Sequence, residues 1–220
     1  SAPWQLAAVG LALLPLVLWT SRYLIDAHPA TDANDGQRHF VWPRGVLLLI
    51  GLLIFAGMVA EGVMYDWSVL YLQQALQWPQ DRAALGYAVF VGAMALTRAV
   101  ADRARQHWGD ERLLQRASAL AAVSMVLALL FPHPVISLVA FAAVGMGLAP
   151  VVPLLYTAAT RVPGSTSAAS LAAVSSIGYS GFVIGPPLIG ALAQAWGLPT
   201  AMWTVAVAAG FLTAGALIKR

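Results

Sequence analysis

The sequence predicts an all-α integral membrane protein with seven transmembrane helices. Its 220 residues are 60% hydrophobic and only 10% charged, and the mean hydropathy is +0.77. Soluble domains carry about 25% charged residues. The charges fall in short segments between long apolar runs, and a helix of about 20 apolar residues crosses the hydrocarbon core of a bilayer. The chain has no cysteine, which excludes a disulfide framework and a Cys-ligated metal site.

The first three spans follow from these runs. The first span is 3–23, and a polar segment, 26–44, follows it. The second span begins near Gly45 and continues to about Asp66 or beyond it, and 67–78 is predicted to be an amphipathic, interfacial segment. The third span covers about 83–98, and a charged loop from Arg98 to Arg112 follows it.

Four more spans come from two longer runs. Between Arg116 and Arg161, and again between Arg161 and Lys219, the sequence holds no Asp, Glu, Lys or Arg. Each run is too long for one span. Pro132-His133-Pro134 divides the first run, and 194–199 divides the second, because proline and glycine end helices.

The basic residues predict the orientation. With seven alternating spans, only Arg82 falls on one side of the membrane, and the other eleven basic residues fall on the opposite side. Cytoplasmic loops carry the excess of Lys and Arg. The N-terminus of the chain is therefore expected outside and the C-terminus in the cytoplasm, as in a multi-pass protein of a bacterial inner membrane.

The chain contains a short internal similarity. Gly86-Tyr87-Ala-Val-Phe-Val in the third span is similar to Gly178-Tyr179-Ser-Gly-Phe-Val in the sixth. Spans two to four and five to seven would then be repeats of three helices. Because the third and sixth spans cross in opposite directions, these repeats would be inverted, as in many secondary transporters.

The segment from Arg98 to Arg112 resembles the cytoplasmic signature loop of the major facilitator superfamily. Asp102-Arg103 and the residues from Gly109 to Arg112 occupy the characteristic places, although Ala101 replaces the usual glycine and Asp110-Glu111 stand where basic residues are common. The match is to the weaker copy of this loop in the C-terminal half of the family. Residues 60–72 look like the seventh helix of bacterial permeases near the fucose permeases, and 181–190 look like the eleventh.

This resemblance implies a domain organisation. Residues 1–25 would be the sixth helix of a twelve-helix transporter, 26–44 a cytoplasmic linker, and 45–220 the C-terminal six-helix domain. The implied function is secondary active transport of a small solute by alternating access, with proton coupling. The implied partners are the solute, protons, the lipid bilayer and an N-terminal half; nucleic acid, a cofactor, a metal and an enzymatic activity are not expected. The alternative is a non-transporting membrane protein, such as an assembly or interaction subunit, built on a similar half bundle.

Glu61 is the main candidate for substrate binding or proton coupling. It lies inside an apolar span, in the half that is predicted to be nearer the outside. An ionised carboxylate is costly there, so we expect Glu61 to face the bundle interior or to find a partner. A structural acid that is hydrogen-bonded to a neighbouring helix, or one that reaches toward the interface, is the alternative. Tyr65 follows at i+4 and shares the face of Glu61.

Other polar residues of the spans are weaker candidates. Tyr179 and Ser176 lie near the middle of the sixth span, where a central cavity is expected, although buried hydroxyls also join helices in membranes. Asp66 and Trp67 are candidates for an outer gate, or they simply mark an interfacial helix end.

Four residues are candidates for cytoplasmic gating. The family resemblance implies that Asp102 caps or pairs across cytoplasmic helix ends and holds one access state. Arg98 and Arg103 would pair with acids on neighbouring helices, and Arg112 completes the signature. A plain membrane-surface loop explains the arginines equally well, but it does not require Asp102.

Overall fold

The computed structural model describes residues 11, 13–15, 18–20, 43–164 and 166–217. Most of the predicted first span and nearly all of the predicted linker lie outside these residues. The chain divides into two units, Ser1–His39 and Phe40–Arg220, and the second unit holds every helix that is discussed below.

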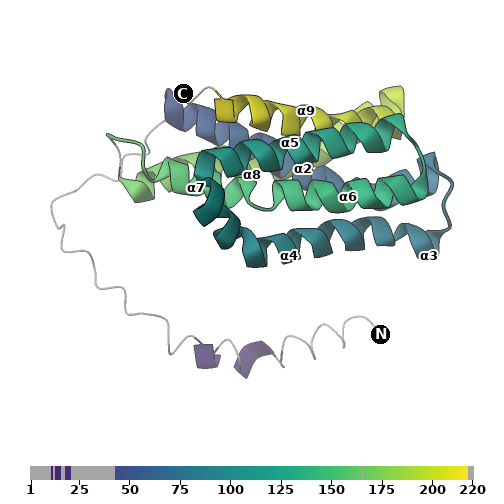
Figure 1. The fold of residues 1–220 in the computed structure, drawn as a ribbon, viewed down its shortest axis with the longest axis horizontal. Helices are drawn as coiled ribbons and strands as arrows, with labels where there is room; N and C mark the ends of the chain where they lie inside the picture. The colour runs from purple at the N-terminus through teal and green to yellow at the C-terminus, as the bar shows by residue number, and fades with distance from the viewer. Residues whose placement is uncertain (1–10, 12, 16–17, 21–42, 165, 218–220) are drawn as a thin grey trace. The chain divides into compact units, whose positions relative to one another are not determined.

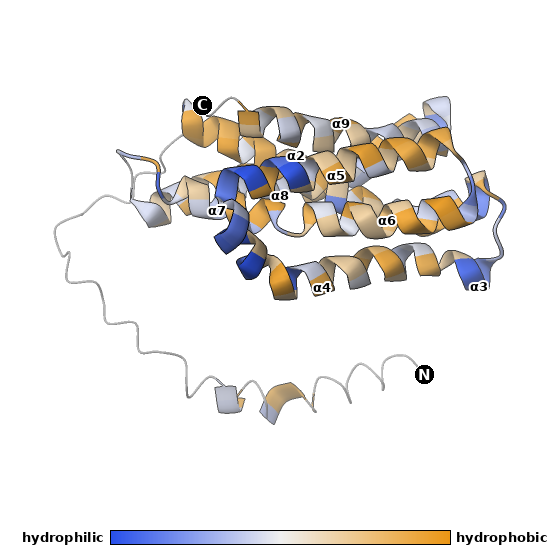
Figure 2. Cartoon of the chain, viewed as in Figure 1, coloured by the Kyte–Doolittle hydropathy of each residue, from blue (hydrophilic) through white to orange (hydrophobic). Residues whose placement is uncertain are grey.

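Six helical segments in the described part of the chain are long and apolar enough to cross a membrane (Figure 1). Two pairs of helices and one π-helical turn, η1, combine into these segments. Their bounds are α2 Val46–Leu70 with η1 Tyr71–Ala75; α3 Gln80–Ala83 with α4 Leu85–Trp108; α5 Asp110–Leu130; α6 Pro134–Leu148 with α7 Val151–Ala159; α8 Ser167–Trp196; and α9 Leu198–Leu217. The all-α membrane bundle is therefore confirmed, and Figure 2 shows the apolar character of the helices along most of their length.

Prolines and glycines mark the helix breaks. Helix α6 begins at Pro134, which has no N–H to leave unpaired in the first turn, and His133 Nδ1 accepts a hydrogen bond from the Val135 N–H at 3.3 Å. Pro150 separates α6 from α7. Gly197 alone separates α8 from α9. The predicted divisions at 132–134 and 194–199 are confirmed.

The second span continues beyond Asp66, and the interfacial position of 67–78 stays a prediction. Helix α2 runs through Trp67 to Leu70 and continues as η1 to Ala75, with Tyr71 and Leu72 buried. These two large side chains pack into the bundle, and their burial favours a continued helix in spite of the neighbouring polar residues. Glu61 therefore lies near the middle of the helical segment from Val46 to Ala75.

The prediction of a loop from Arg98 to Arg112 is wrong. Helix α4 continues through this segment to Trp108, and α5 begins at Asp110. Gly109 alone makes the turn, with φ +74°, a left-handed conformation that favours glycine. The charges therefore lie on the end of α4 and the start of α5, which form an elbow at Gly109. The sequence did not exclude this, because a helix can carry many charged side chains on its exposed faces.

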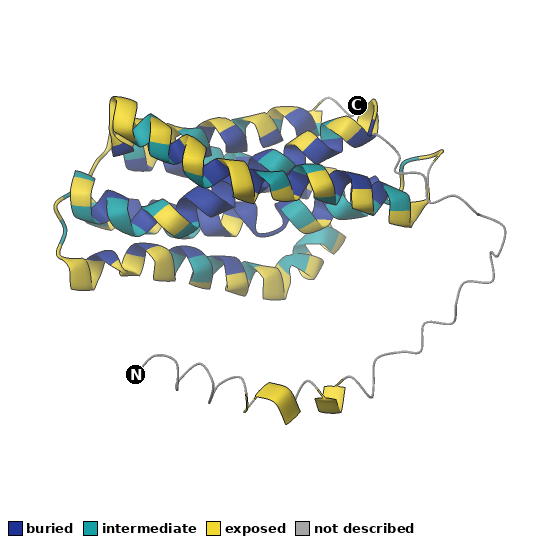
Figure 3. Ribbon diagram, turned by 180° about the vertical axis from the view of Figure 1, so that it is seen from behind, coloured by how far each residue is buried: buried dark blue, intermediate teal, exposed yellow. Residues whose placement is uncertain are grey.

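Helix α2 is the centre of the bundle. Of its most apolar stretch, 67% is buried, compared with 22% for the segment that contains α4. Figure 3 shows buried residues on the inward faces of the helices and exposed residues on the outward faces. A helix that is apolar all round is expected to be buried, and α2 is such a helix.

The packing agrees with the predicted inverted repeats. The most extensive contacts join α2 with α8, α4 with α6, α5 with α6, α2 with α9, and α5 with α9. In the predicted repeats, α2 corresponds to α6, α4 to α8, and α5 to α9. When each helix is replaced by its counterpart, the same five helix pairs result. Equivalent helices of the two triplets therefore pack on each other.

Glycines allow the closest of these contacts. A Cβ atom at Gly145 of α6 would collide with the backbone carbonyl of Phe90 in α4. A Cβ atom at Gly181 of α8 would lie 2.8 Å from the carbonyl oxygen of Phe55 in α2. Small residues let helix backbones approach closely in membranes, where packing drives association.

Candidate functional site

An ion pair between α2 and α4 lies at mid-height of the bundle. Arg98 Nη2 is 3.8 Å from Glu61 Oε1, and the Glu61 side chain is 8% exposed while that of Arg98 is 49% exposed. Glu61 Oε1 is buried and has no hydrogen-bond partner among the described residues. The structure therefore places Arg98 on helix α4 as the half-exposed partner of the buried Glu61, and not in a loop.

Aromatic side chains lie beside this pair, toward the end of the bundle that is away from the charged elbow. The Tyr65 hydroxyl donates to Met94 Sδ at 3.6 Å, and the Tyr65 ring meets the Phe90 ring edge-on with centroids 5.4 Å apart. The Tyr87 ring lies 6.0 Å from the Tyr65 ring. The expectation that Tyr65 shares the face of Glu61 agrees with this arrangement, since Tyr65 and Glu61 contact the same face of α4. Phe90 and Met94 are buried, so they act as packing.

The candidates on α8 lie apart from the ion pair. Tyr179 is 57% exposed, and the Ser176 hydroxyl donates to the Ala172 carbonyl of its own helix at 2.9 Å. Neither side chain forms a hydrogen bond to Glu61 or Arg98 in the described part of the chain. A hydroxyl that bonds one turn back in its own helix does not join two helices.

Asp66 and Trp67 do not mark a helix end, because the helical segment continues to Ala75. Asp66 is exposed. Trp67 lines a cavity of about 470 Å³ together with Gln74 and Gln194, near the ends of the segments that contain α2 and α8. An outer-gate role for these two residues stays a prediction.

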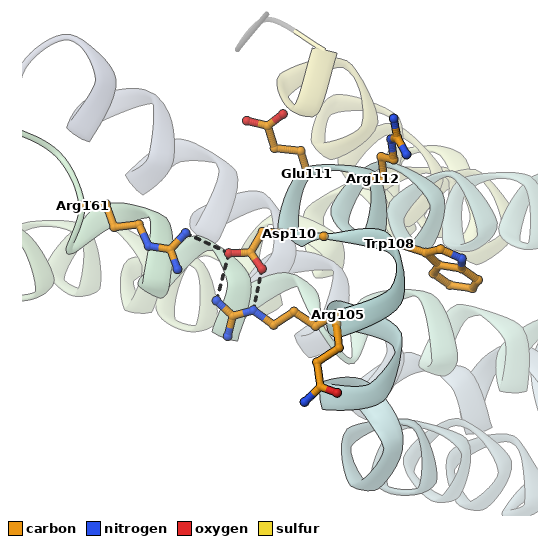
Figure 4. Close-up of a pocket in the computed structure, with 8 residues that line it drawn as sticks. Arg105, Trp108, Asp110, Glu111, Arg112 and Arg161 are labelled. Carbon is orange, nitrogen blue, oxygen red and sulfur yellow. Dashed lines mark hydrogen bonds and ion pairs between the residues drawn. The ribbon is translucent and has the colours of Figure 1, made fainter.

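The charged elbow contains a second ion-pair network, centred on Asp110 (Figure 4). Arg105 Nε and Nη2 donate to the two carboxylate oxygens of Asp110 at 2.5 and 2.9 Å. Arg161, which follows α7, donates from Nη1 to Asp110 Oδ2 at 3.1 Å. One carboxylate thus joins the end of α4, the start of α5 and the segment after α7. We call these three residues the Asp110 cluster.

The gating residues predicted from the sequence lie beside this cluster. Asp102 is exposed and lines a cavity of about 230 Å³ with Arg98 and Arg105, but no hydrogen bond or ion pair of Asp102 occurs within the described residues. Arg103 and Arg112 are exposed. Asp110, which the sequence analysis did not single out as a site residue, makes the cross-helix pairing that was expected of Asp102.

The sequence held one signal for Asp110. Asp110 is the first residue of α5, and the dipole of a helix favours a negative charge there. Arg105, five residues earlier, faces Asp110 only because Gly109 folds the chain sharply. Arg161 lies 51 residues away, and nothing in the local pattern shows that it approaches Asp110.

Taken together, six apolar helical segments in the described part of the chain, with the buried carboxylate of Glu61 among them, define a polytopic membrane protein. A family model described as Major Facilitator Superfamily matches residues 1–181. The chain belongs to this superfamily.

Similar proteins come from three bacteria. The chain is 33% identical over 200 residues to a protein named an uncharacterised MFS-type transporter in Yersinia pestis, covering 89% of the chain and 52% of that protein. It is 33% identical over 214 residues to membrane protein MosC of Rhizobium meliloti, covering 96% and 52%. It is 31% identical over 188 residues to a protein named the uncharacterised transporter y4wD in Sinorhizobium fredii, covering 85% and 48%. The chain thus spans about half the length of the curated relatives that it matches.

Proposed function

We propose that the complete protein is a secondary transporter of a bacterial inner membrane. It moves a small solute by alternating access, and protons drive the movement through Glu61. Family membership and the names of two of the relatives support transport. The pairing of the buried Glu61 with Arg98 is the single observation that supports proton coupling. The C-terminus of the chain would be cytoplasmic, and a further bundle of helices would complete the solute cavity against α4 and α8.

The pair supports coupling for an electrostatic reason. When Glu61 is charged, it neutralises Arg98 across the α2–α4 contact. When Glu61 binds a proton, the attraction disappears, and the two helices lose an interaction that holds them together. A proton thus changes the relative free energy of two conformations only if the pair differs between them.

The Asp110 cluster would stabilise the cytoplasmic end in this cycle. It joins three segments at a charged elbow, next to the cavity of about 230 Å³ that Asp102 lines. Trp67 and Asp66 would act at the opposite end, beside the cavity of about 470 Å³. The two cavities would open in turn.

Cysteine accessibility tests this proposal without knowledge of the solute. The chain has no cysteine, so single cysteines report cleanly once any cysteines elsewhere in the complete protein are replaced. Ala101→Cys lies in the cavity near Arg98, and Gln194→Cys lies in the outer cavity. Each is labelled from its own side with an impermeant maleimide, in the parental background and with Glu61→Gln, at the same pH.

We expect Glu61→Gln, which mimics the protonated acid, to change the two labelling rates in opposite directions. Acidification should then change the ratio of the two rates in the parental protein but not in the Glu61→Gln background. Equal rates in both backgrounds would remove Glu61 from coupling. Rates that never change in opposite directions would favour the alternative, a non-transporting membrane protein.

A further inference from the structure

The ion pair between Glu61 and Arg98 leaves hydrogen-bonding capacity unused. The distance of 3.8 Å between Arg98 Nη2 and Glu61 Oε1 is longer than a hydrogen bond. Glu61 Oε1 is buried without a partner, and no acceptor for the Arg98 guanidinium occurs within the described residues. A guanidinium has five N–H donors in a planar fork that matches a carboxylate. Arg98 therefore has donors available for a second carboxylate.

Apart from α4, the helices that pack on α2 offer no other counterion to the pair. Helices α6, α7, α8 and α9, which all pack on α2, contain no Asp, Glu, Lys, Arg or His within their bounds. Their titratable groups are the hydroxyls of Tyr156 and Tyr179, and Tyr65 and Tyr87 are the tyrosines closest to the pair. If Glu61 becomes neutral, the half-exposed guanidinium of Arg98 has no ion-pair partner within the described residues. An unpaired cation on a membrane-spanning helix is unfavourable, so the site attracts an anion.

A cavity connects Arg98 with the charged end of the bundle. Its volume is about 230 Å³, and its lining includes Arg98, Asp102, Arg105 and the break at Pro150. Pockets for drug-sized ligands start at about 300 Å³, so this space suits a smaller solute. Asp110 already neutralises Arg105, and Asp102 lies one turn from Arg98 toward the charged end. Among the residues that line this cavity, Arg98 is therefore the cation that is available to a solute.

We propose that the transported solute is a small organic monocarboxylate, which binds Arg98 in place of Glu61. This inference rests on the proposed transport function. One proton binds Glu61, the Glu61 carboxyl becomes neutral, and the carboxylate of the solute pairs with the Arg98 guanidinium. The net charge of the site is zero before and after the exchange. One proton and one anion therefore move together, and the coupled step is electroneutral.

The test uses acetate as the anionic probe and acetamide as its uncharged counterpart. The melting temperature of the complete protein in detergent is measured against probe concentration, for the parental protein, Glu61→Gln, Arg98→Gln and the double variant. At pH 8, we expect acetate to stabilise Glu61→Gln in a saturable manner, with an affinity at least about fivefold stronger than for the parental protein. Acetamide should have no effect, and the double variant should not respond to acetate beyond the effect of ionic strength.

A second comparison keeps the test decisive if Glu61→Gln is poorly folded. At pH 5.5, acetate should stabilise the parental protein more than at pH 8, and Arg98→Gln should abolish the difference. The inference is overturned if acetate stabilises neither Glu61→Gln nor the acidified parental protein, or if its effect persists without Arg98. An equal response to acetamide would also overturn it.

The result is separable from the proposed function. If acetate binds as expected but the two cysteine positions never respond to Glu61→Gln in opposite directions, the anion site stands and proton-linked transport fails. If the cysteine positions respond and acetate does not bind, transport stands and the monocarboxylate is wrong.

Discussion

The Asp110 cluster gives the most direct prediction of stability. Asp110→Asn keeps the shape of the side chain and removes the charge that holds Arg105 and Arg161. Exposed ion pairs contribute about 0.2–1 kcal/mol each. The pair of Arg105 with Asp110 belongs near the upper end of this energy range, because it has two hydrogen bonds and both side chains are about one-third exposed. The pair of Arg161 with Asp110 belongs near the lower end of the range, because the Arg161 side chain is 66% exposed. We expect a total loss of about 1–1.5 kcal/mol.

Thermal unfolding of the complete protein in detergent measures this loss. For a domain of this size it corresponds to a fall in Tm of roughly 2–6 °C. Hydrogen exchange should increase mainly at the end of α4 and after α7, where the two arginines lie. Glu111→Gln is the matched control. Glu111 is exposed, lies in the same first turn of α5 and forms no ion pair within the described residues. Its substitution removes the same charge from the helix N-terminus.

The salt dependence provides the refutation. Since exposed charges are screened within about 3 Å at 1 M salt, the difference between Asp110→Asn and Glu111→Gln should shrink when salt is raised from about 0.05 M to about 1 M. Equal melting temperatures of the two variants at low salt would show that the cluster contributes nothing to stability.

Three further variants test the packing and the buried pair by the same melting assay. Gly145→Ala should lower the free energy of unfolding by about 1–3 kcal/mol, because the new Cβ meets a backbone carbonyl. The control is Gly210→Ala, whose Cβ would have no atom within 4 Å and which should change this free energy by less than about 1 kcal/mol. Similar losses in the two variants would contradict the close packing of α4 and α6. Arg98→Gln should lower the free energy of unfolding by about 1–3 kcal/mol at pH 8, because the charged Glu61 then has no counterion. The loss should be smaller at pH 5, where a proton neutralises Glu61. A loss that is independent of pH would argue against the pair. Tyr71→Phe should cost no more than about 1 kcal/mol, since the hydroxyl donates a 3.4 Å hydrogen bond to a carbonyl of α5, and a larger loss would show that the hydroxyl has another role.

The number of spans in the described region was predictable, because charge-free runs and prolines act locally. The breaks at Pro134 and Gly197 follow from the absence of an N–H in proline and from the flexibility of glycine. The ends of α2 and α4 were not predictable in this way. Polar residues such as Asp66 and Asp102 are found both in loops and on exposed faces of long helices, and the local pattern does not separate the two cases.

The site was predictable in part. Glu61 was found because an acid in an apolar span is rare, and Arg98 was expected to pair with an acid of a neighbouring helix, although it was placed in a loop. The identity of the pair depends on the register between α2 and α4, which no local pattern gives. The choice of Asp102 over Asp110 followed the family signature, whereas the sharp turn at Gly109 decides which carboxylate reaches the arginines.

The order of the helices has a consequence for membrane insertion. The main partner of α2 is α8, which leaves the ribosome much later, so α2 must wait in lipid before its largest interface forms. During this time Glu61 is a charged or protonatable group on a helix without its final neighbours. The next membrane-spanning segment contains α4, which carries Arg98, so an early hairpin of these two segments would already neutralise Glu61. The same pair that we propose for coupling would then also protect the nascent chain during biogenesis.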